Sequence, residues 1–433
     1  MDEEILSYVW ENRLFRVNKL QTTCGKPLTI RHPGHKNADS GPDFQLSRLK
    51  IESGEWVGQV EIHVKSSDWF KHGHQNDEAY RGLILHVVWE HDKEIPQLSE
   101  AGVHTLELQN FIDPLELERC YELLHSLELI PCKAEPAKDI LVKTQWLDRM
   151  LAERLENKSI QILQTLDKCG NDWQEVLYRC IARAFGLKVN VFPFEMLSTI
   201  LPYRLLARNR GYENRLEALI FGQSGFLHPQ LIDQYPQHLR QEYLSLSKAY
   251  ALEAMAVSNW KFMRMHPNGF PTLRLAQFAQ LLRNVHPLTD LISITDSLDE
   301  LTAFFTSKPH PYWDDHYRFD KAVSPFSSRM GIDSASMIII NAMIPFIFTY
   351  GKSRHDQDLQ NKAISMLDQI PAESNKIIRL WDHLEMKVNS ASDTQALIHA
   401  YSRYCSSKKC LSCTLGRTRL KTTTDGIKNS GVF

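Results

Sequence analysis

The sequence predicts an α+β protein, with a mixed β-sheet flanked by helices at the N-terminus and a large all-α region after it. Two observations support this prediction. Before Asp113 and Pro114, short β-type apolar patterns alternate with turn residues, and after them almost every segment has helical periodicity. The 433 residues are enough for two or three domains. We expect an α/β domain at 1–112, a helical domain at 113–404, and a cysteine cluster with a basic tail at 405–433.

The elements of the first region follow from their apolar periodicity. Residues 3–16 carry apolar side chains at helical spacing, and the polar, histidine-rich connection at 68–80 has room for a further helix. The strands either alternate or, where both faces are covered, are continuously apolar. They are expected at 28–30, 44–51, 56–66, 83–89 and 103–108. The predicted order is helix, three strands, helix and two strands.

Helical periodicity continues through the second region, without a repeat of fixed period. The longest apolar run, at 337–350, contains Asn341 and Pro345 and is too short to span a membrane, so it predicts a buried helix. Helices are expected at 114–129, 144–166, 173–185, 193–208, 237–256, 273–284, 333–348 and 393–404.

Charge and cysteine content limit the classes of function. The formal net charge of −2 provides no general attraction to nucleic acid, so such a partner must use a local basic patch. Residues 1–4 are acidic and lack a signal-peptide pattern. The eight cysteines are scattered except for three near the end, which favours a reducing compartment over a disulfide framework. We expect a cytoplasmic protein that does not associate with membranes.

The strand at 56–66 carries candidate catalytic residues. Within residues 60–65, three apolar side chains alternate with Glu61, His63 and Lys65. Because successive side chains of a strand point to opposite faces, these three polar groups line one face.

Asp43, after Pro42 at the start of the preceding strand, is the expected partner of Glu61. Two carboxylates and the Ile62 carbonyl are oxygen ligands suited to Mg²⁺ or Mn²⁺, with positions left for water and phosphate. Lys65 would then orient the attacking water and stabilise the developing charge. The competing interpretation is a turn at Asp43 and a solvated face that carries Glu61 and Lys65.

A second polar group follows the strand. His72, His74 and Asp77 have side chains that can bind zinc or manganese, contact a scissile phosphate or act as a general base. They also fit a solvated polar loop.

The first site resembles the PD-(D/E)xK nuclease superfamily. In that superfamily, a proline and an aspartate at a strand start are followed by an acid and a lysine, two residues apart, on the next strand. Asp43 and Glu61 match the two acids. His63 stands where the lysine normally lies, and Lys65 follows two residues later, so either residue is a candidate for its role. The resemblance implies a restriction-endonuclease-like fold up to about residue 110.

The same resemblance implies a further glutamate near the metal from the N-terminal helix, for which Glu3 and Glu4 are candidates. A wider resemblance, to the uncharacterised bacterial DUF2851 family, spans nearly the whole chain and implies no established activity. The segments that carry it are 41–44, 60–69, 72–74, 83–88, 268–276 and 404–413.

Three cysteines near the end of the chain predict a second metal site. Cys405, Cys410 and Cys413 have four and then two residues between them, a spacing found in iron–sulfur proteins, and zinc sites also use the two-residue spacing. Both metals therefore remain candidates. The fourth ligand is expected to be Cys132, with Cys120 or His399 as alternatives.

Basic residues surround this cluster and would suit contact with a nucleic-acid backbone. They are Lys408, Lys409, Arg417, Arg419 and Lys421.

The leading hypothesis is a divalent-metal-dependent nuclease that acts on DNA or RNA, with the helical region positioning the nucleic acid. The alternative is a non-catalytic scaffold that binds nucleic acid or protein and keeps a degenerate nuclease fold. A third hypothesis is a metal hydrolase that acts on another phosphoester through the histidines.

Overall fold

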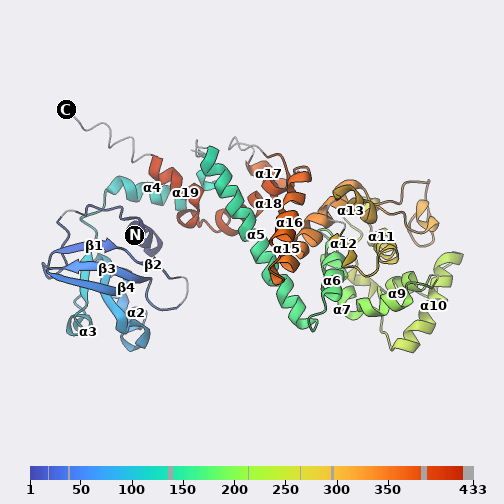
Figure 1. Ribbon diagram of the computed structural model, residues 1–433, viewed down its shortest axis with the longest axis horizontal. Coiled ribbons are helices and arrows are strands. Elements are labelled where there is room, and N and C mark those ends of the chain that lie inside the picture. Colours follow the sequence, from blue (N-terminus) through green and yellow to red (C-terminus); the bar gives the residue numbers. More distant parts are fainter. Residues whose placement is uncertain are drawn as a thin grey trace. The chain divides into compact units, whose positions relative to one another are not determined.

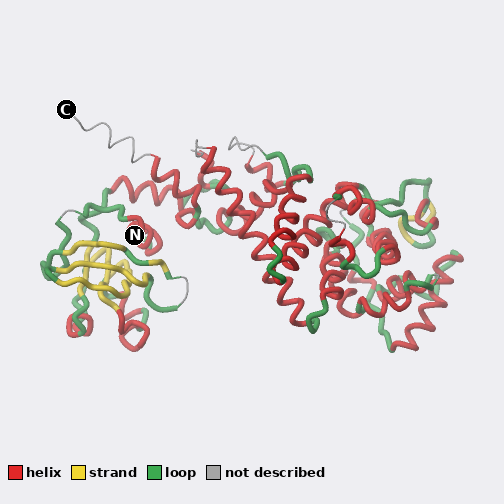
Figure 2. Tube along the Cα trace, viewed as in Figure 1, coloured by secondary structure: helices red, strands yellow, loops and turns green. Residues whose placement is uncertain are grey.

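The structure divides into two compact units, which we call the sheet unit and the helical unit. The sheet unit comprises Met1–Trp146, Leu380–Met386 and Ala400–Phe433, and the helical unit comprises Leu147–Arg379 and Lys387–His399. A mixed sheet followed by a large helical region confirms the predicted α+β class (Figures 1 and 2). The computed structural model describes residues 1–17, 19–37, 40–134, 140–212, 214–263, 265–293, 297–381 and 388–422.

A mixed sheet forms the centre of the sheet unit. Its strands are β1 (Leu28–His32), β2 (His35–Lys36), β3 (Phe44–Ile51), β4 (Gly54–Lys65), β5 (Leu83–Glu90) and β6 (His104–Glu107). The order is β1-β3-β4-β5-β6, and β2 pairs with β3. The first three strands of this order are antiparallel, and β4, β5 and β6 are parallel. All five predicted strands are present, and β2 is an additional short strand.

Helices connect and cover these strands. The helix α1 (Glu3–Asn12) packs against β4 and buries Trp10 completely. The parallel connection from β4 to β5 contains α2 (Asp68–Lys71), whose Trp69 is also buried, and α3 (Pro96–Glu100) precedes β6. The polar connection predicted after β4 therefore does contain a helix, and it lies beside the strand that carries Glu61 and His63.

The C-terminal segment belongs to the sheet unit. It forms a π-helical turn, η9 (Tyr401–Cys405), a 3-10 turn, η10 (Cys410–Ser412), and the helix α19 (Thr414–Thr422). The helix α19 packs against α4 (Pro114–Leu124) and against the 3-10 turn η3 (Pro131–Ala134). Segments separated by almost 300 residues in the sequence thus lie side by side (Figure 1).

Helices α5 to α18 lie wholly or mainly in the helical unit, together with a small hairpin of β7 (His316–Arg318) and β8 (Lys321–Ala322). A π-helical turn joins α14 to α15, and the resulting helix Ile332–Ser353 is, among the described residues, long and apolar enough to cross a membrane. However, 67% of its apolar window is buried, as in the core helix of a globular unit. The helices are α5 (Ile140–Lys168), α6 (Trp173–Phe185), α7 (Val191–Ile200), α8 (Tyr203–Asn209), α9 (Arg215–Gln223), α10 (Gln234–Tyr250), α11 (Pro271–Asn284), α12 (Asp290–Ser293), α13 (Leu298–Phe305), α14 (Ile332–Ile338), α15 (Ile344–Ser353), α16 (Gln357–Gln369), α17 (Lys376–Trp381) and α18 (Ala391–Ala400).

Several predicted helices have different limits in the structure; for example, the helices expected at 3–16 and 114–129 end at Asn12 and Leu124. The helix expected at 193–208 is split into α7 and α8 at Pro202. Proline has no N–H to continue the helical hydrogen bonds, and the backbone of Pro202 is extended. The helix expected at 237–256 ends before Ala251, which adopts a left-handed conformation with φ of 51°.

Candidate active site

The predicted carboxylate pair lies where β3 begins beside β4. Phe44 pairs with Val60 across the two antiparallel strands, so Asp43 and Glu61 are neighbours. The Asp43 N–H donates to Glu61 Oε2 at 3.2 Å, and the Ile62 N–H donates to Asp43 Oδ2 at 3.0 Å. The pleat buries Glu61 to 5% exposure, with the apolar Val60 and Ile62 on the opposite face. Two carboxylates are thus held together in a largely dry position.

Burial and mutual repulsion disfavour ionisation of these carboxylates. Burial, and to a lesser extent the charge of Asp43, raises the pKa of Glu61 to about 9. Burial also raises the pKa of Asp43, although the hydrogen bond from Ile62 and the charge of Lys36 act in the opposite direction. A bound cation would relieve both effects, because it attracts the ionised forms.

A third carboxylate, that of Glu3 in the first turn of α1, interacts electrostatically with the pair. Its pKa is raised by burial and then by the charge of Asp43, and its own charge raises the pKa of Glu61. Glu3 is half-buried, whereas Glu4 is exposed. Of the two glutamates considered from the sequence, Glu3 is therefore the one that lies beside the pair.

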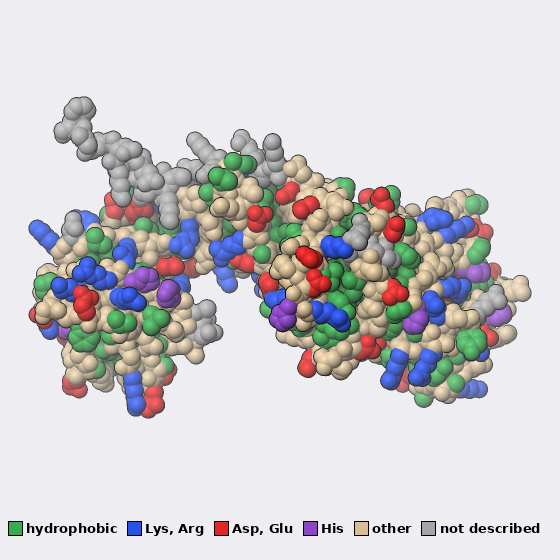
Figure 3. All heavy atoms as spheres, viewed as in Figure 1, with side chains coloured by type: hydrophobic (Ala, Val, Ile, Leu, Met, Phe, Trp, Pro, Cys, Tyr) green, Lys and Arg blue, Asp and Glu red, His purple; other side chains and the backbone are tan. Residues whose placement is uncertain are grey.

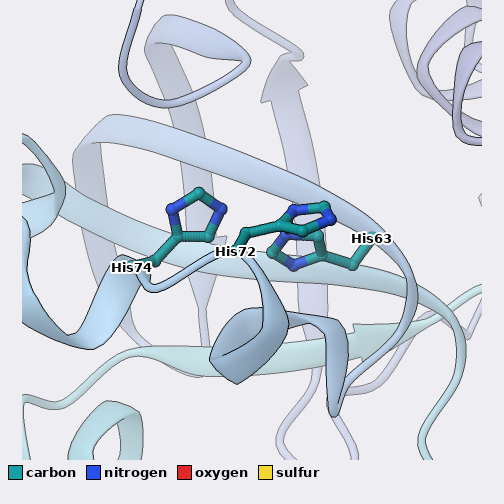
Figure 4. A group of neighbouring side chains, drawn as sticks. All are labelled: His63, His72 and His74. Atoms are coloured by element: carbon teal, nitrogen blue, oxygen red, sulfur yellow. Dashed lines mark hydrogen bonds between the residues drawn. The ribbon is translucent and has the colours of Figure 1, made fainter.

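Three histidines form a compact group beside these carboxylates. One ring nitrogen from each of His63, His72 and His74 lies within 4.8 Å of the other two. Figure 4 shows that His63 projects from β4, while His72 and His74 come from the connection that follows it. His63 Nε2 lies 3.1 Å from His72 Nδ1, close to the separation of about 3.4 Å expected for two nitrogens on one tetrahedral zinc ion.

Glu61 joins the carboxylates and the histidines into one set of donors. Its Oε1 lies 3.2 Å from His74 Nε2 and 3.5 Å from His63 Nε2. His74 Nε2 is buried and makes no hydrogen bond of acceptable geometry to any described residue. A buried nitrogen without a hydrogen bond is costly, and coordination of a cation would compensate for it. The arrangement therefore has the chemistry of a metal site.

His63 forms a hydrogen bond with His86 of β5. His63 Nδ1 lies 2.8 Å from His86 Nε2, and both rings are fully buried. Burial lowers the pKa of His63 to about 2 and that of His86 to about 3, so both imidazoles are neutral. If His63 donates its Nδ1 proton to His86, its Nε2 lone pair can accept from His72 Nδ1 or, in place of that hydrogen bond, bind a cation. Metal-binding histidines in proteins are oriented by hydrogen bonds of this kind.

Two residues of the site were missed from the sequence. Tyr80 packs its ring on His74, with 4.1 Å between centroids, and burial together with the charges of Glu61 and Asp43 raises its pKa. Lys36 of β2 pairs with the first residue of β3, and its charge lowers the pKa of Asp43. In the sequence, only its place in the polar loop before Asp43 pointed to Lys36. Its closeness to Asp43 depends on the pairing of β2 with β3, which the sequence did not predict.

Lys65 is not brought to the carboxylates. It lies at the end of β4, about 13 Å along the strand from Glu61, and its Nζ forms a 3.3 Å ion pair with Glu90 of β5. Asp77, also considered from the sequence, accepts a hydrogen bond from the Ala79 N–H and caps a 3-10 turn.

The four predicted cysteine ligands lie in the sheet unit, on elements that pack against one another. All four are buried, namely Cys132, Cys405, Cys410 and Cys413. Burial raises the pKa of the Cys405 thiol most, and the charges of the other three cysteines raise it as well. None of the chain's eight cysteines, all within the described residues, forms a disulfide. His399, a considered alternative for the fourth ligand, belongs to the helical unit and lies 3.4 Å from Glu153.

Comparison with known proteins defines the family of this chain. No curated protein and no solved structure shows significant similarity to it. The model of a family described as "Protein of unknown function (DUF2851)" matches residues 3–376, which is most of the chain. The protein therefore belongs to the DUF2851 family.

Proposed function

We propose that the protein is a divalent-metal-dependent phosphodiester hydrolase, a nuclease that acts on DNA or RNA. The observation that carries the proposal is the buried carboxylate of Glu61, which accepts from the Asp43 N–H. The same carboxylate lies 3.2 Å from His74 Nε2 and 3.5 Å from His63 Nε2, so these residues form one set of donors. Phosphodiester hydrolysis needs a cation beside the phosphate and open positions for water, and this set supplies both hard and borderline ligands.

The donor set favours Zn²⁺ over Mg²⁺, because imidazole nitrogens suit Zn²⁺ and Mg²⁺ prefers oxygen and water. Mn²⁺, which also suits oxygen ligands, would be held mainly by the carboxylates. Glu61, Asp43 and Glu3 would hold the metal from one side, and His63, His72 and His74 from the other. A metal held there would lower the pKa of a bound water and neutralise charge on the phosphate. His86 would keep the His63 ring in the orientation needed for binding.

Lys36 is our candidate for the cation that contacts the phosphate or the attacking water. Its charge acts on Asp43, whereas Lys65 pairs with Glu90. Figure 3 shows Lys, Arg and histidine side chains, with Asp and Glu side chains among them, on one face of the sheet unit. A chain of nearly neutral net charge needs such local basic groups to bind a polyanion.

The test compares two glutamates on neighbouring strands. Purified wild type, Glu61→Gln and Glu90→Gln are assayed with single- and double-stranded DNA and RNA, and with Mn²⁺, Zn²⁺ and Mg²⁺ in turn. We expect hydrolysis in wild type and Glu90→Gln and its loss in Glu61→Gln. Equal activity of wild type and Glu61→Gln would indicate a contaminating nuclease and refute the site. A parallel comparison of Lys36→Met with Lys65→Met identifies the lysine that contributes.

The second candidate function is a non-catalytic scaffold that binds nucleic acid or protein. The observation that favours it is the ion pair between Lys65 and Glu90, which leaves a histidine in place of the lysine of the nuclease motif. Tight binding of DNA or RNA without turnover, unchanged in Glu61→Gln, would support this scaffold over the hydrolase.

A further inference from the structure

The cysteine cluster of the sheet unit is a candidate site separate from the carboxylates and histidines. Cys405 ends η9, Cys410 begins η10, and Cys413 follows it directly. Cys132 lies in η3, which packs against α19 immediately after these turns. Each of the four side chains is at most 7% exposed. Four buried thiols from two distant segments therefore lie on elements that pack against one another.

The backbone around the cluster is shaped to bring the thiols together. Lys408 adopts a left-handed conformation with φ of 54°, and the Cys410 N–H donates to its carbonyl at 2.8 Å, which tightens the turn between Cys405 and Cys410. A Cβ on Gly416 would lie 2.4 Å from the Cys410 carbonyl oxygen, so α19 approaches the turn as closely as only glycine permits.

We propose that Cys132, Cys405, Cys410 and Cys413 bind a thiophilic metal centre, either one Zn²⁺ or an iron–sulfur cluster. Four cysteine thiolates are the full ligand set of both centres. The order of spacings, four residues and then two, is the one used by plant-type ferredoxins, and the two-residue spacing is also used by structural zinc sites. The shared chemistry is tetrathiolate coordination, and experiment separates the two metals.

The centre would be a structural cross-link rather than a surface for nucleic acid. Lys408 Nζ donates to the carbonyl oxygens of Ser126 and Glu128, and Arg417 bonds to Asn12. These basic side chains, which the sequence suggested for phosphate contacts, therefore hold the C-terminal segment against the sheet unit. The metal would join the same segment to Cys132, and it would close a loop of 272 residues between Cys132 and Cys405.

The test measures metal in the full-length protein purified without oxygen. Wild type, Cys410→Ser and Cys24→Ser are compared for zinc, iron and acid-labile sulfide, and Cys24 is the control because it is exposed and outside the cluster. We expect Cys410→Ser to lose the zinc, or the iron and sulfide, of one centre and Cys24→Ser to keep it. A brown colour with visible absorbance indicates iron–sulfur, and its absence with bound zinc indicates zinc.

A second measurement on wild type covers the case in which Cys410→Ser does not fold. A mercurial that binds thiolates is titrated into the native protein, and the released metal and the protease sensitivity of the C-terminal segment are followed. Release of metal together with faster cleavage after residue 400 is the expected result. Native protein that holds neither metal, even after reconstitution with zinc or with iron and sulfide, would overturn the proposal.

An independent observation concerns a cavity of about 280 Å³ in the helical unit. Its walls are mainly apolar, with Phe185, Phe194 and Met337 among them, and Arg274 of α11 is its buried charged group at 6% exposure. The Arg274 guanidinium donates to Gln277 and Ser334, but its Nε has no hydrogen-bond partner among the described residues. The N-terminus of α11 lies at the same cavity.

We infer that this cavity binds a small carboxylate with an apolar body. Within the described residues, Arg274 forms no ion pair, and a buried guanidinium without a counter-ion is costly. A ligand carboxylate would pair with the Arg274 guanidinium, gain from the positive end of α11, and place its apolar body against the aromatic walls.

The test uses octanoate and octan-1-ol as matched probes, which differ in charge but share an apolar chain. Calorimetric titrations are made with wild type, Arg274→Lys and Arg274→Gln. We expect octanoate to bind wild type about tenfold or more tightly than octan-1-ol, and this ratio to persist in part in Arg274→Lys and vanish in Arg274→Gln. Equal binding of both probes by wild type, or binding of neither, would overturn the inference.

Discussion

Proton competition at Glu61 is expected to control metal binding at the candidate active site. With a pKa of about 9, Glu61 is mostly protonated at neutral pH in the metal-free protein. A cation binds the ionised carboxylate, so each pH unit below 9 should reduce the apparent affinity about tenfold. Between about pH 8.5 and about pH 6.5, the dissociation constant should therefore rise about 100-fold, or ~2.7 kcal/mol.

The assay titrates Mn²⁺ into metal-free protein at several pH values and follows free Mn²⁺ by electron paramagnetic resonance. Glu90→Gln should keep the pH dependence, because Glu90 pairs with Lys65 outside the donor set. Glu61→Gln cannot ionise and should show weak binding with a much flatter dependence. An affinity for wild type that does not change across this pH range would refute the reasoning.

Three further predictions concern the sheet unit. Metal-free protein should lose stability as pH rises from about 4.3 to 9, because over this range the folded state keeps a proton on Glu61 that the unfolded chain has released. In thermal melts, added Mn²⁺ should reverse this loss of stability. His86→Phe should weaken metal binding about 10- to 100-fold, because His63 loses the group that orients its ring, and an unchanged dissociation constant would exclude that role. Trp10→Ala should lower the free energy of unfolding by about 3–5 kcal/mol, because Trp10 is fully buried and its Nε1 donates to the Pro33 carbonyl; a urea titration that shows less than about 1 kcal/mol would contradict this.

Strongly periodic elements were predicted well. The helix expected at 173–185 is α6, which has one buried face and one polar face. Asp172 caps it, because its side chain accepts hydrogen bonds from two N–H groups of the first turn. The helix α9 (Arg215–Gln223) was missed because residues 216–223 are all buried. A helix enclosed on all sides has no polar face, so its sequence shows no periodicity to detect.

Part of the candidate site could also be predicted. Alternation along β4 placed Glu61 and His63 on one face, and Pro42 and Asp43 marked the start of the neighbouring strand. The cysteine spacing likewise singled out Cys405, Cys410 and Cys413, and Cys132 was chosen as the fourth thiol. These inferences depend on local geometry, namely the two-residue period of a strand and short spacings within a turn.

Tertiary structure decided which of these groups meet. Glu3 and Lys36 come to Asp43 through the packing of α1 and the pairing of β2, and the crossover after β4 places His74 beside Glu61. The register of β4 on β5 pairs Lys65 with Glu90 instead. Strand pairing, crossover path and burial are long-range properties, and they set both the distances between charged groups and the cost of ionising them. A local pattern contains neither quantity, so the distances and the pKa shifts within the candidate site are visible only once the chain is folded.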